Sequence, residues 1–121
     1  MDTQQTYAAY LPHIRKRWEA EQKGWQERRQ QAWIVARQIA TLLHDTFGAE
    51  QVVVYGSLAG EGPFDARSDI DLAVSGVKSA DFFRAYAQAM SLSPAFEIDL
   101  IDLADCTQQL REAVLRGGVQ L

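Results

Sequence analysis

Two short segments of alternating polar and apolar residues constrain the fold of this chain more than any other feature. In Asp69–Val74 and in Phe96–Leu103 the apolar residues recur at every second position, with carboxylates at several of the positions between them. Side chains alternate across a β-strand, so each segment predicts a strand with one apolar face and one acidic face. The apolar faces require a covering layer of helices, which favours a layered α/β fold.

The rest of the chain predicts those helices and a further strand. Apolar residues at helical spacing predict a helix from about Pro12, which suits a first turn, to Phe47, before Gly48. Gly24 is unfavourable inside a helix, so this segment is either one long helix or two helices joined there. Its apolar stripe includes five residues spaced by seven, a coiled-coil-like period: Leu11, Trp18, Trp25, Ala32 and Ile39.

The remaining elements complete an expected order of α-β-β-α-β-α. A β-branched run at 51–55 predicts the first strand, residues 58–67 a loop, and residues 80–90 a helix. A last helix is expected to run to about residue 116, with Asp105 and Gln108 as its capping box. The fold class is α/β (α+β), a small mixed sheet packed with helices. We divide it into a helical arm, 1–47, and a single sheet-bearing domain, 48–121.

The outer part of the helical arm is expected to project from a domain of this size. If it is straight, Trp18 lies roughly 45 Å from Gly48, well beyond the body. Either the arm folds back near Gly24 or it carries its apolar stripe to another chain, as a homo- or hetero-oligomer. We favour the contact with another chain, because tryptophan is enriched at interface hot spots. Trp33, by contrast, is expected to pack in the core.

Charge and composition exclude several classes of function. Residues up to Thr46 carry seven basic and five acidic side chains, whereas the rest carries five basic and eleven acidic ones. An acidic body is a poor general surface for nucleic acids. No apolar stretch is long enough to cross a membrane, no signal peptide is evident, and Cys106 is the single cysteine. Together these features predict a cytoplasmic protein.

The acidic faces of the two alternating segments predict a metal site. Asp69 and Asp71 lie on the same side of their strand, and Asp99 joins them if the two strands are neighbours. Clustered carboxylates repel one another and raise each other's pKa values, a conflict that a divalent cation relieves. Mg²⁺ prefers oxygen ligands and commonly combines carboxylates with substrate phosphates. The pattern therefore indicates phosphoryl-transfer chemistry.

A glycine-serine turn follows the first predicted strand directly. At Gly56 and Ser57 the backbone can point N–H groups at a phosphate, and the serine hydroxyl can donate a further hydrogen bond. A Gly-Ser pair alone is a common turn. Its position, with eleven residues between Ser57 and Asp69, is what links it to the predicted metal site.

These parts together resemble the nucleotidyltransferase superfamily that includes DNA polymerase β, and in particular its minimal nucleotidyltransferases. The motifs that carry the resemblance are Val53-Val54-Tyr55-Gly56-Ser57, Ser68-Asp69-Ile70-Asp71-Leu72 and Glu97-Ile98-Asp99-Leu100-Ile101. The resemblance implies that Gly56 and Ser57 hold the nucleotide's phosphates and that Asp69 and Asp71 bind Mg²⁺. Asp99 would complete the metal site or deprotonate the acceptor hydroxyl.

The implied reaction is attack on the α-phosphate of a nucleotide such as ATP, transferring AMP and releasing pyrophosphate. The resemblance also implies a partner, because such transferases are often paired as antitoxins with HEPN-domain ribonuclease toxins and can adenylylate a tyrosine on them. Two further residues are candidates for the nucleotide site: Arg67, which can reach back to a phosphate, and Ser68, which either orients Asp69 or begins the strand.

Two departures from the family pattern leave alternatives open. Eleven residues separate Ser57 from Asp69, where ten is usual, and the arginine that many relatives carry after Gly-Ser is missing. The first alternative is therefore an inactive antitoxin that acts by binding. The second is a transferase acting on a small molecule such as an aminoglycoside, although the chain has no obvious second domain to form an acceptor pocket.

The other polar candidates have structural interpretations. His13 and His44 lack a second ligand at zinc spacing. Cys106 is expected to be a small buried helix residue. Asp102 and Asp105 are expected to end a strand and cap a helix.

Overall fold

The computed structural model describes residues 3–121, and their side chains from residue 12 onward. It contains three α-helices, a short 3-10 helix and four strands in these residues. In chain order they are α1 (Thr3–Phe47), β1 (Gln51–Tyr55), β2 (Ile70–Ser75), η1 (Ser79–Asp81), α2 (Phe82–Ser91), β3 (Ile98–Asp102), α3 (Gln108–Gly117) and β4 (Val119–Gln120). Apart from β4, this is the order that the sequence predicts.

The four strands form one mixed sheet in the order β3-β2-β1-β4. β2 is parallel to β3 and antiparallel to β1, and β1 is antiparallel to β4. The mixed α/β fold predicted from the sequence is confirmed. Strand β4 was not predicted, because it is only two residues long and follows two glycines, Gly117 and Gly118.

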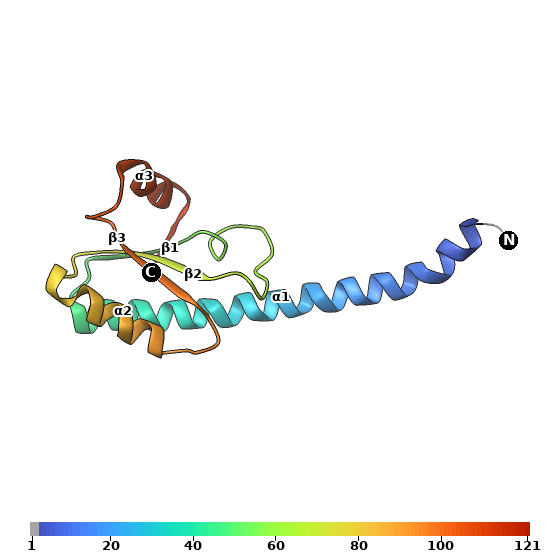
Figure 1. The fold of residues 1–121 in the computed structure, drawn as a ribbon, viewed down its shortest axis with the longest axis horizontal. Coiled ribbons are helices and arrows are strands. Elements are labelled where there is room, and N and C mark those ends of the chain that lie inside the picture. Colours follow the sequence, from blue (N-terminus) through green and yellow to red (C-terminus); the bar gives the residue numbers. More distant parts are fainter. Residues whose placement is uncertain (1–2) are drawn as a thin grey trace.

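Helix α1 is one continuous helix, and the predicted alternative of a fold-back near Gly24 is wrong. Gly24 is exposed and nothing approaches the position of an added Cβ, so no tertiary contact bends the chain there. The helix begins at Thr3, and Pro12 lies inside it and not in its first turn. Figure 1 shows its N-terminal half projecting beyond the body. The side chain of Leu11, the first member of the predicted stripe, lies outside the described residues.

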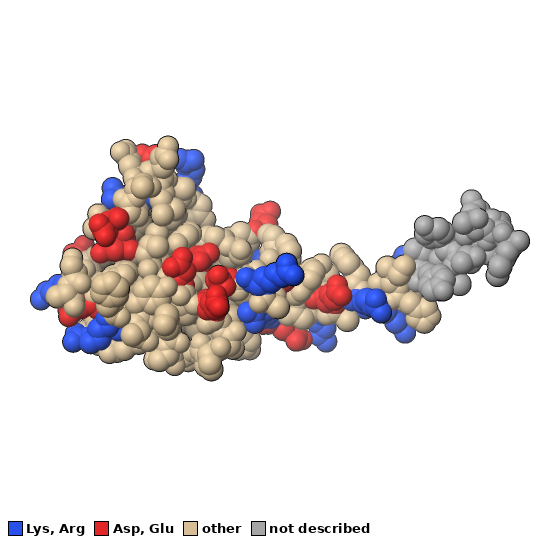
Figure 2. Space-filling model, in the orientation of Figure 1, with Lys and Arg blue, Asp and Glu red and all other residues tan. Residues whose placement is uncertain are grey.

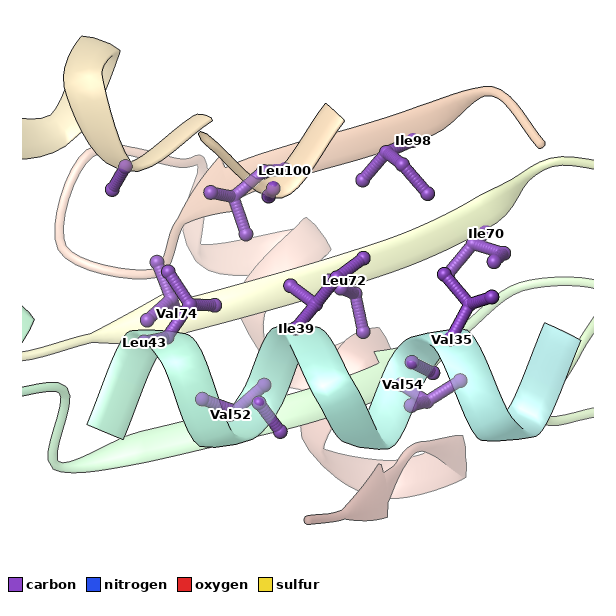
Figure 3. Close-up of a cluster of buried hydrophobic side chains, with 14 of the residues drawn as sticks. Val35, Ile39, Leu43, Val52, Val54, Ile70, Leu72, Val74, Ile98 and Leu100 are labelled. Atoms are coloured by element: carbon purple, nitrogen blue, oxygen red, sulfur yellow. The ribbon is translucent and has the colours of Figure 1, made fainter. Parts of the chain in front are cut away.

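One face of the sheet is covered by α1 and α2. The alternating residues Val52 and Val54 of β1 and Leu72 of β2 are fully buried against this layer. Figure 3 shows the same cluster from the side, with Ile39 of α1 pointing at the sheet. The predicted inward set is confirmed: Ile70, Leu72, Val74, Phe96, Ile98 and Leu100. Trp33 packs at the edge of this cluster, as predicted.

The opposite face of the sheet is covered only in part. Val53 and Ala73 are buried there beneath Val114 of α3, with Leu103 completing a small second cluster. The same alternation that buries Ala73 places Asp71 two residues earlier on this face, beyond the cover of α3. The sheet therefore has one closed face and one face left partly open.

Two local predictions near the C-terminus are wrong. The N-cap of α3 is Thr107, whose hydroxyl accepts a hydrogen bond from the Leu110 N–H (3.2 Å), and not Asp105. Asp105 instead lies in the turn after β3, where its N–H donates to the Asp102 carbonyl (3.0 Å). Cys106 lies in the same turn, half-buried and outside any helix. Asp102 does end its strand, since its carboxylate accepts from the Ala104 N–H (2.9 Å).

Candidate functional site

The parallel pairing of β2 with β3 brings two of the predicted carboxylates together. Asp71 and Asp99 are register partners across these neighbouring strands. Asp69 lies just before β2, which begins at Ile70 and not, as predicted, at Asp69. The Ile70 N–H donates to the Glu97 carbonyl (2.9 Å), so the parallel ladder starts beside Asp69. Asp71 and Asp99 thus lie side by side on the open face, and the charge of Asp69 is close enough to raise the pKa of Asp71.

The electrostatics of Asp71 reflect this crowding. Burial, and then the charges of Asp99 and Asp69, raise the pKa of Asp71 from 3.8 to about 6. Asp71 is half-buried, whereas Asp99 is exposed at the edge strand. Without a cation, the Asp71 carboxyl therefore keeps its proton up to about pH 6 and is charged above it.

Gly56 fits its position for two independent reasons. Its φ of +69° is in the left-handed region that favours glycine, and a Cβ at this position would collide with the Asp71 carboxylate. Because it has no side chain, Gly56 lets the backbone after β1 approach the Asp71 carboxylate closely. Ser57 follows it and is exposed, with its hydroxyl available to a ligand. The predicted Gly-Ser turn and the carboxylates are therefore neighbours.

Ser68 and Arg67 are engaged with Asp65 and not with Asp69. The Ser68 hydroxyl accepts from the Asp65 N–H (3.1 Å) and lies 3.4 Å from the Asp65 carboxylate. The Arg67 N–H donates to the same carboxylate (2.9 Å), and its side chain is exposed. The structure supports neither role predicted for Ser68, because its hydroxyl contacts Asp65 and not Asp69, and β2 begins only at Ile70.

Two tyrosines that sequence reasoning missed flank the carboxylates. The Tyr86 hydroxyl donates to the Ile98 carbonyl (2.9 Å) and lies 3.3 Å from an Asp99 carboxylate oxygen. Burial and the negative charges of Asp71 and Asp99 raise the pKa of Tyr55 to about 12. Tyr55 stands directly before Gly56, so its position beside the site could have been predicted from the sequence. Tyr86 carries no sequence signal, because it reaches the site from α2.

Two arginines of α1 hold the connection between β1 and β2, and they too were missed. Arg28 donates to the Asp65 carbonyl (2.9 Å), and Arg29 donates to the carbonyls of Leu58 (2.9 Å), Gly60 (2.8 Å) and Gly62. The only signal was two adjacent basic residues on a helix, which ordinarily indicates a solvated face.

The donor set fits a magnesium ion that is completed by phosphate. Within residues 12–121, no group of three or more His, Cys, Asp or Glu side chains is gathered closely enough to hold a metal by itself. Mg²⁺ does not require such a cage, because it commonly takes one or two carboxylates and fills its shell with water and phosphate oxygens. The paired Asp71 and Asp99 supply that number, and their mutual repulsion favours a cation.

Two hollows lie near the site. One of about 240 Å³ is lined by Asp69 and Glu97 and by Arg28 and Arg67. A larger one of about 600 Å³ lies at the C-terminal end of β3, lined by Phe83 and Cys106 among others, and contains none of the predicted site residues. The smaller hollow therefore combines two basic and two acidic side chains.

Residues 37–121 match the family of the polymerase β nucleotidyltransferases. The chain belongs to this family. The match covers the inner part of α1 and the whole sheet, including Gly56, Ser57 and the three aspartates of the candidate site. Among the curated proteins, none matches this sequence.

Solved structures agree with this assignment. A protein described as a minimal nucleotidyltransferase is 28% identical over 77% of this chain and 95% of its own, with a TM-score of 0.63. The complex of the tri-AMPylated Shewanella oneidensis HEPN toxin with MNT antitoxin matches at 22% identity over 74% of this chain and 70% of that chain, TM-score 0.56. A toxin–antitoxin structure with AMP-PNP matches at 24% identity over 70% of both chains, TM-score 0.58. The latter two show a shared fold.

No helix of the described residues is long and apolar enough to cross a membrane.

Proposed function

We propose that this protein is a nucleotidyltransferase that moves AMP from ATP to a hydroxyl on a partner protein, acting as the antitoxin of a HEPN toxin. The observation that carries the proposal is the register pairing of Asp71 with Asp99 beside the Gly56–Ser57 turn. Its support from relatives is the likeness to a complex that contains an AMPylated HEPN toxin and to one with AMP-PNP.

In this proposal the site residues bind the phosphates, hold the metal and accept a proton. Ser57 and the backbone N–H groups of its turn bind the β- and γ-phosphates. Asp71 and Asp99, with Asp69, would hold Mg²⁺, which when bound neutralises charge on the phosphates. The exposed Asp99 also accepts the proton of the acceptor hydroxyl. A new bond then forms between that oxygen and the α-phosphorus, the α–β phosphate bond breaks, and pyrophosphate leaves.

The exposed Arg67 extends the nucleotide site at its rim. It lines the hollow beside Asp69, where a polyphosphate can neutralise its charge. This arrangement substitutes in part for the arginine missing after Gly-Ser. Arg67 therefore keeps its predicted place among the nucleotide-binding residues in this proposal.

The second candidate function is an antitoxin that binds its partner without chemistry. The residues Leu58, Ala59 and Gly60 that follow Ser57 offer no cation to a phosphate, and this observation favours it. The projecting half of α1 supplies an interaction surface in either case, with Trp18 59% exposed and Ile14 58% exposed. We propose that this surface contacts another chain.

One experiment separates the two functions. The protein is incubated with Mg²⁺ and α-labelled ATP, alone and with a HEPN protein encoded beside it, as wild type and as Asp69→Asn. Label on the partner that disappears in the variant is the expected result. Tight binding of the partner without label, equal in both proteins, would instead establish the binding antitoxin. An Asp45→Asn variant, which makes the same change at an exposed position of α1, controls for the loss of charge alone.

A further inference from the structure

The connection between β1 and β2 is the part of the site with the least internal support. It contains Gly60 and Gly62, which have large conformational freedom, and only Leu58 and Phe64 are anchored in the core. Its other residues between 59 and 67 are exposed or half-buried. A loop of this composition needs contacts from elsewhere to hold one conformation.

Those contacts come from two adjacent residues of α1, Arg28 and Arg29, which we name the arginine clamp. Between them they donate to four backbone carbonyls of the loop, at Leu58, Gly60, Gly62 and Asp65. Figure 1 shows the loop reaching α1 beyond the end of the sheet. A guanidinium carries five N–H donors in a rigid plane, which suits several acceptors at once.

Aromatic rings hold the clamp itself in place. The Arg28 guanidinium lies 4.5 Å from the centre of the Phe96 ring and 5.7 Å from that of Phe64, and Arg29 lies 5.9 Å from that of Phe64. Both arginines are half-buried, unlike the other basic residues of the outer helix. Phe96 lies outside the loop, so its ring can hold the Arg28 guanidinium in place independently of the loop.

The clamp leads directly to the phosphate-binding turn. Arg29 holds the carbonyls of Leu58 and Gly60, and the Gly60 N–H in turn donates to the Gly56 carbonyl (3.1 Å). Gly56 lies against Asp71. A continuous set of hydrogen bonds therefore joins α1 to the turn that faces the carboxylates.

We infer that Arg28 and Arg29 are positioning residues for nucleotide binding, which fix the Gly56–Ser57 turn from a helical segment that the family match does not include. The match begins at residue 37, eight residues after the clamp. This inference rests on the proposed function. A pre-formed turn binds phosphate more tightly, because less backbone freedom is lost on binding.

The test uses the full chain and AMP-PNP with Mg²⁺, titrated calorimetrically at a temperature where every variant is folded. Arg29→Gln is expected to raise the Kd for AMP-PNP about tenfold, because the loop loses the hydrogen bonds that the charged guanidinium donates to it. Amide exchange across residues 58–66 is expected to accelerate in the same variant. Arg17→Gln, the same change at an exposed position of the same helix, is expected to alter neither quantity.

Arg29→Lys separates the fork of donors from the charge. Lysine keeps the charge but cannot reach three carbonyls in one plane, so we expect weak binding and fast exchange to persist. Full recovery in Arg29→Lys, or an unchanged Kd in Arg29→Gln with only a lower Tm, would overturn the positioning role. A wild-type protein that binds no nucleotide would overturn the proposed function and this role with it.

Discussion

The two faces of the sheet are made by neighbouring residues of the same strands, yet they serve different purposes. Val54 and Leu72 point into a large apolar layer beneath α1 and α2, whereas Val53 and Asp71, each one residue away, point to the other side. No polar side chain is buried among residues 12–121, so the packing of the closed face is apolar throughout. The open face is covered only in part, and its carboxylates therefore stay accessible.

The largest expected effect lies on the open face. Asp71→Asn removes one of the two paired carboxylates and is expected to reduce AMP transfer by roughly 100-fold or more, as loss of one preorganised electrostatic group does. It should not lower stability at pH 7.5, because it relieves repulsion. Transfer rate and urea unfolding measured on the same preparation check both statements. A large loss of stability would mean that this face is structural.

A matched pair of valines compares the faces directly. Val54→Ala is expected to lower the free energy of unfolding by about 1–3 kcal/mol, through lost burial and a cavity in a dense layer. Val53→Ala should cost less, since its cluster is small and its half-buried neighbours, among them Tyr55 and Ile101, can move inward. Urea denaturation measures both, and a larger loss at Val53 would contradict the comparison.

The pH dependence of stability is a further test of the comparison between the two faces of the sheet. The folded state binds a proton at Asp71 with a pKa of about 6, against 3.8 as the ordinary value. Between these values the folded state holds more protons than the unfolded one, so stability falls as pH rises from about 4 to about 6. We therefore expect the Tm at pH 5 minus the Tm at pH 7.5, both measured in EDTA, to be larger in the wild type than in Asp71→Asn.

Magnesium provides the companion measurement. Added Mg²⁺ should raise the Tm more at pH 7.5 than at pH 5, because protonated Asp71 is a poor ligand. An equal rise at both pH values would place the ion elsewhere.

The smallest effect is expected at a residue that belongs to neither face. Trp18 lies on the projecting part of α1 and is 59% exposed, so Trp18→Ala should change the free energy of unfolding by less than about 0.5 kcal/mol. If this surface joins two chains, the substitution lowers the mass measured by light scattering. A marked loss of stability with unchanged mass would show that Trp18 packs within its own chain.

The strands were predicted because their polar and apolar residues alternate along the sequence, whereas contacts between residues far apart in the chain were missed. Asp71 and Asp99 were placed on one face because strand periodicity is a local property. Tyr86 and Arg29 reach the site from helices, and their orientation follows from packing that no local pattern encodes. The start of α1 was misplaced for a related reason, since Pro12 is a statistical marker of a first turn and not an absolute barrier.

The distribution of charge was also predicted only in part. Figure 2 shows several acidic side chains on the body and basic side chains interspersed with acidic ones along the projecting helix. The counts do not reveal that Arg28 and Arg29 donate hydrogen bonds to the loop and are therefore only half-exposed.

The parallel pairing of β2 with β3 also has a consequence for the order of folding. Parallel neighbours need a long crossover, here the 22 residues from 76 to 97 that contain α2, whereas β1 and β2 are antiparallel. Contacts between distant segments close slowly. The two aspartates therefore meet only when this crossover has closed, and a divalent ion bound between them would report the arrival of β3 in its place.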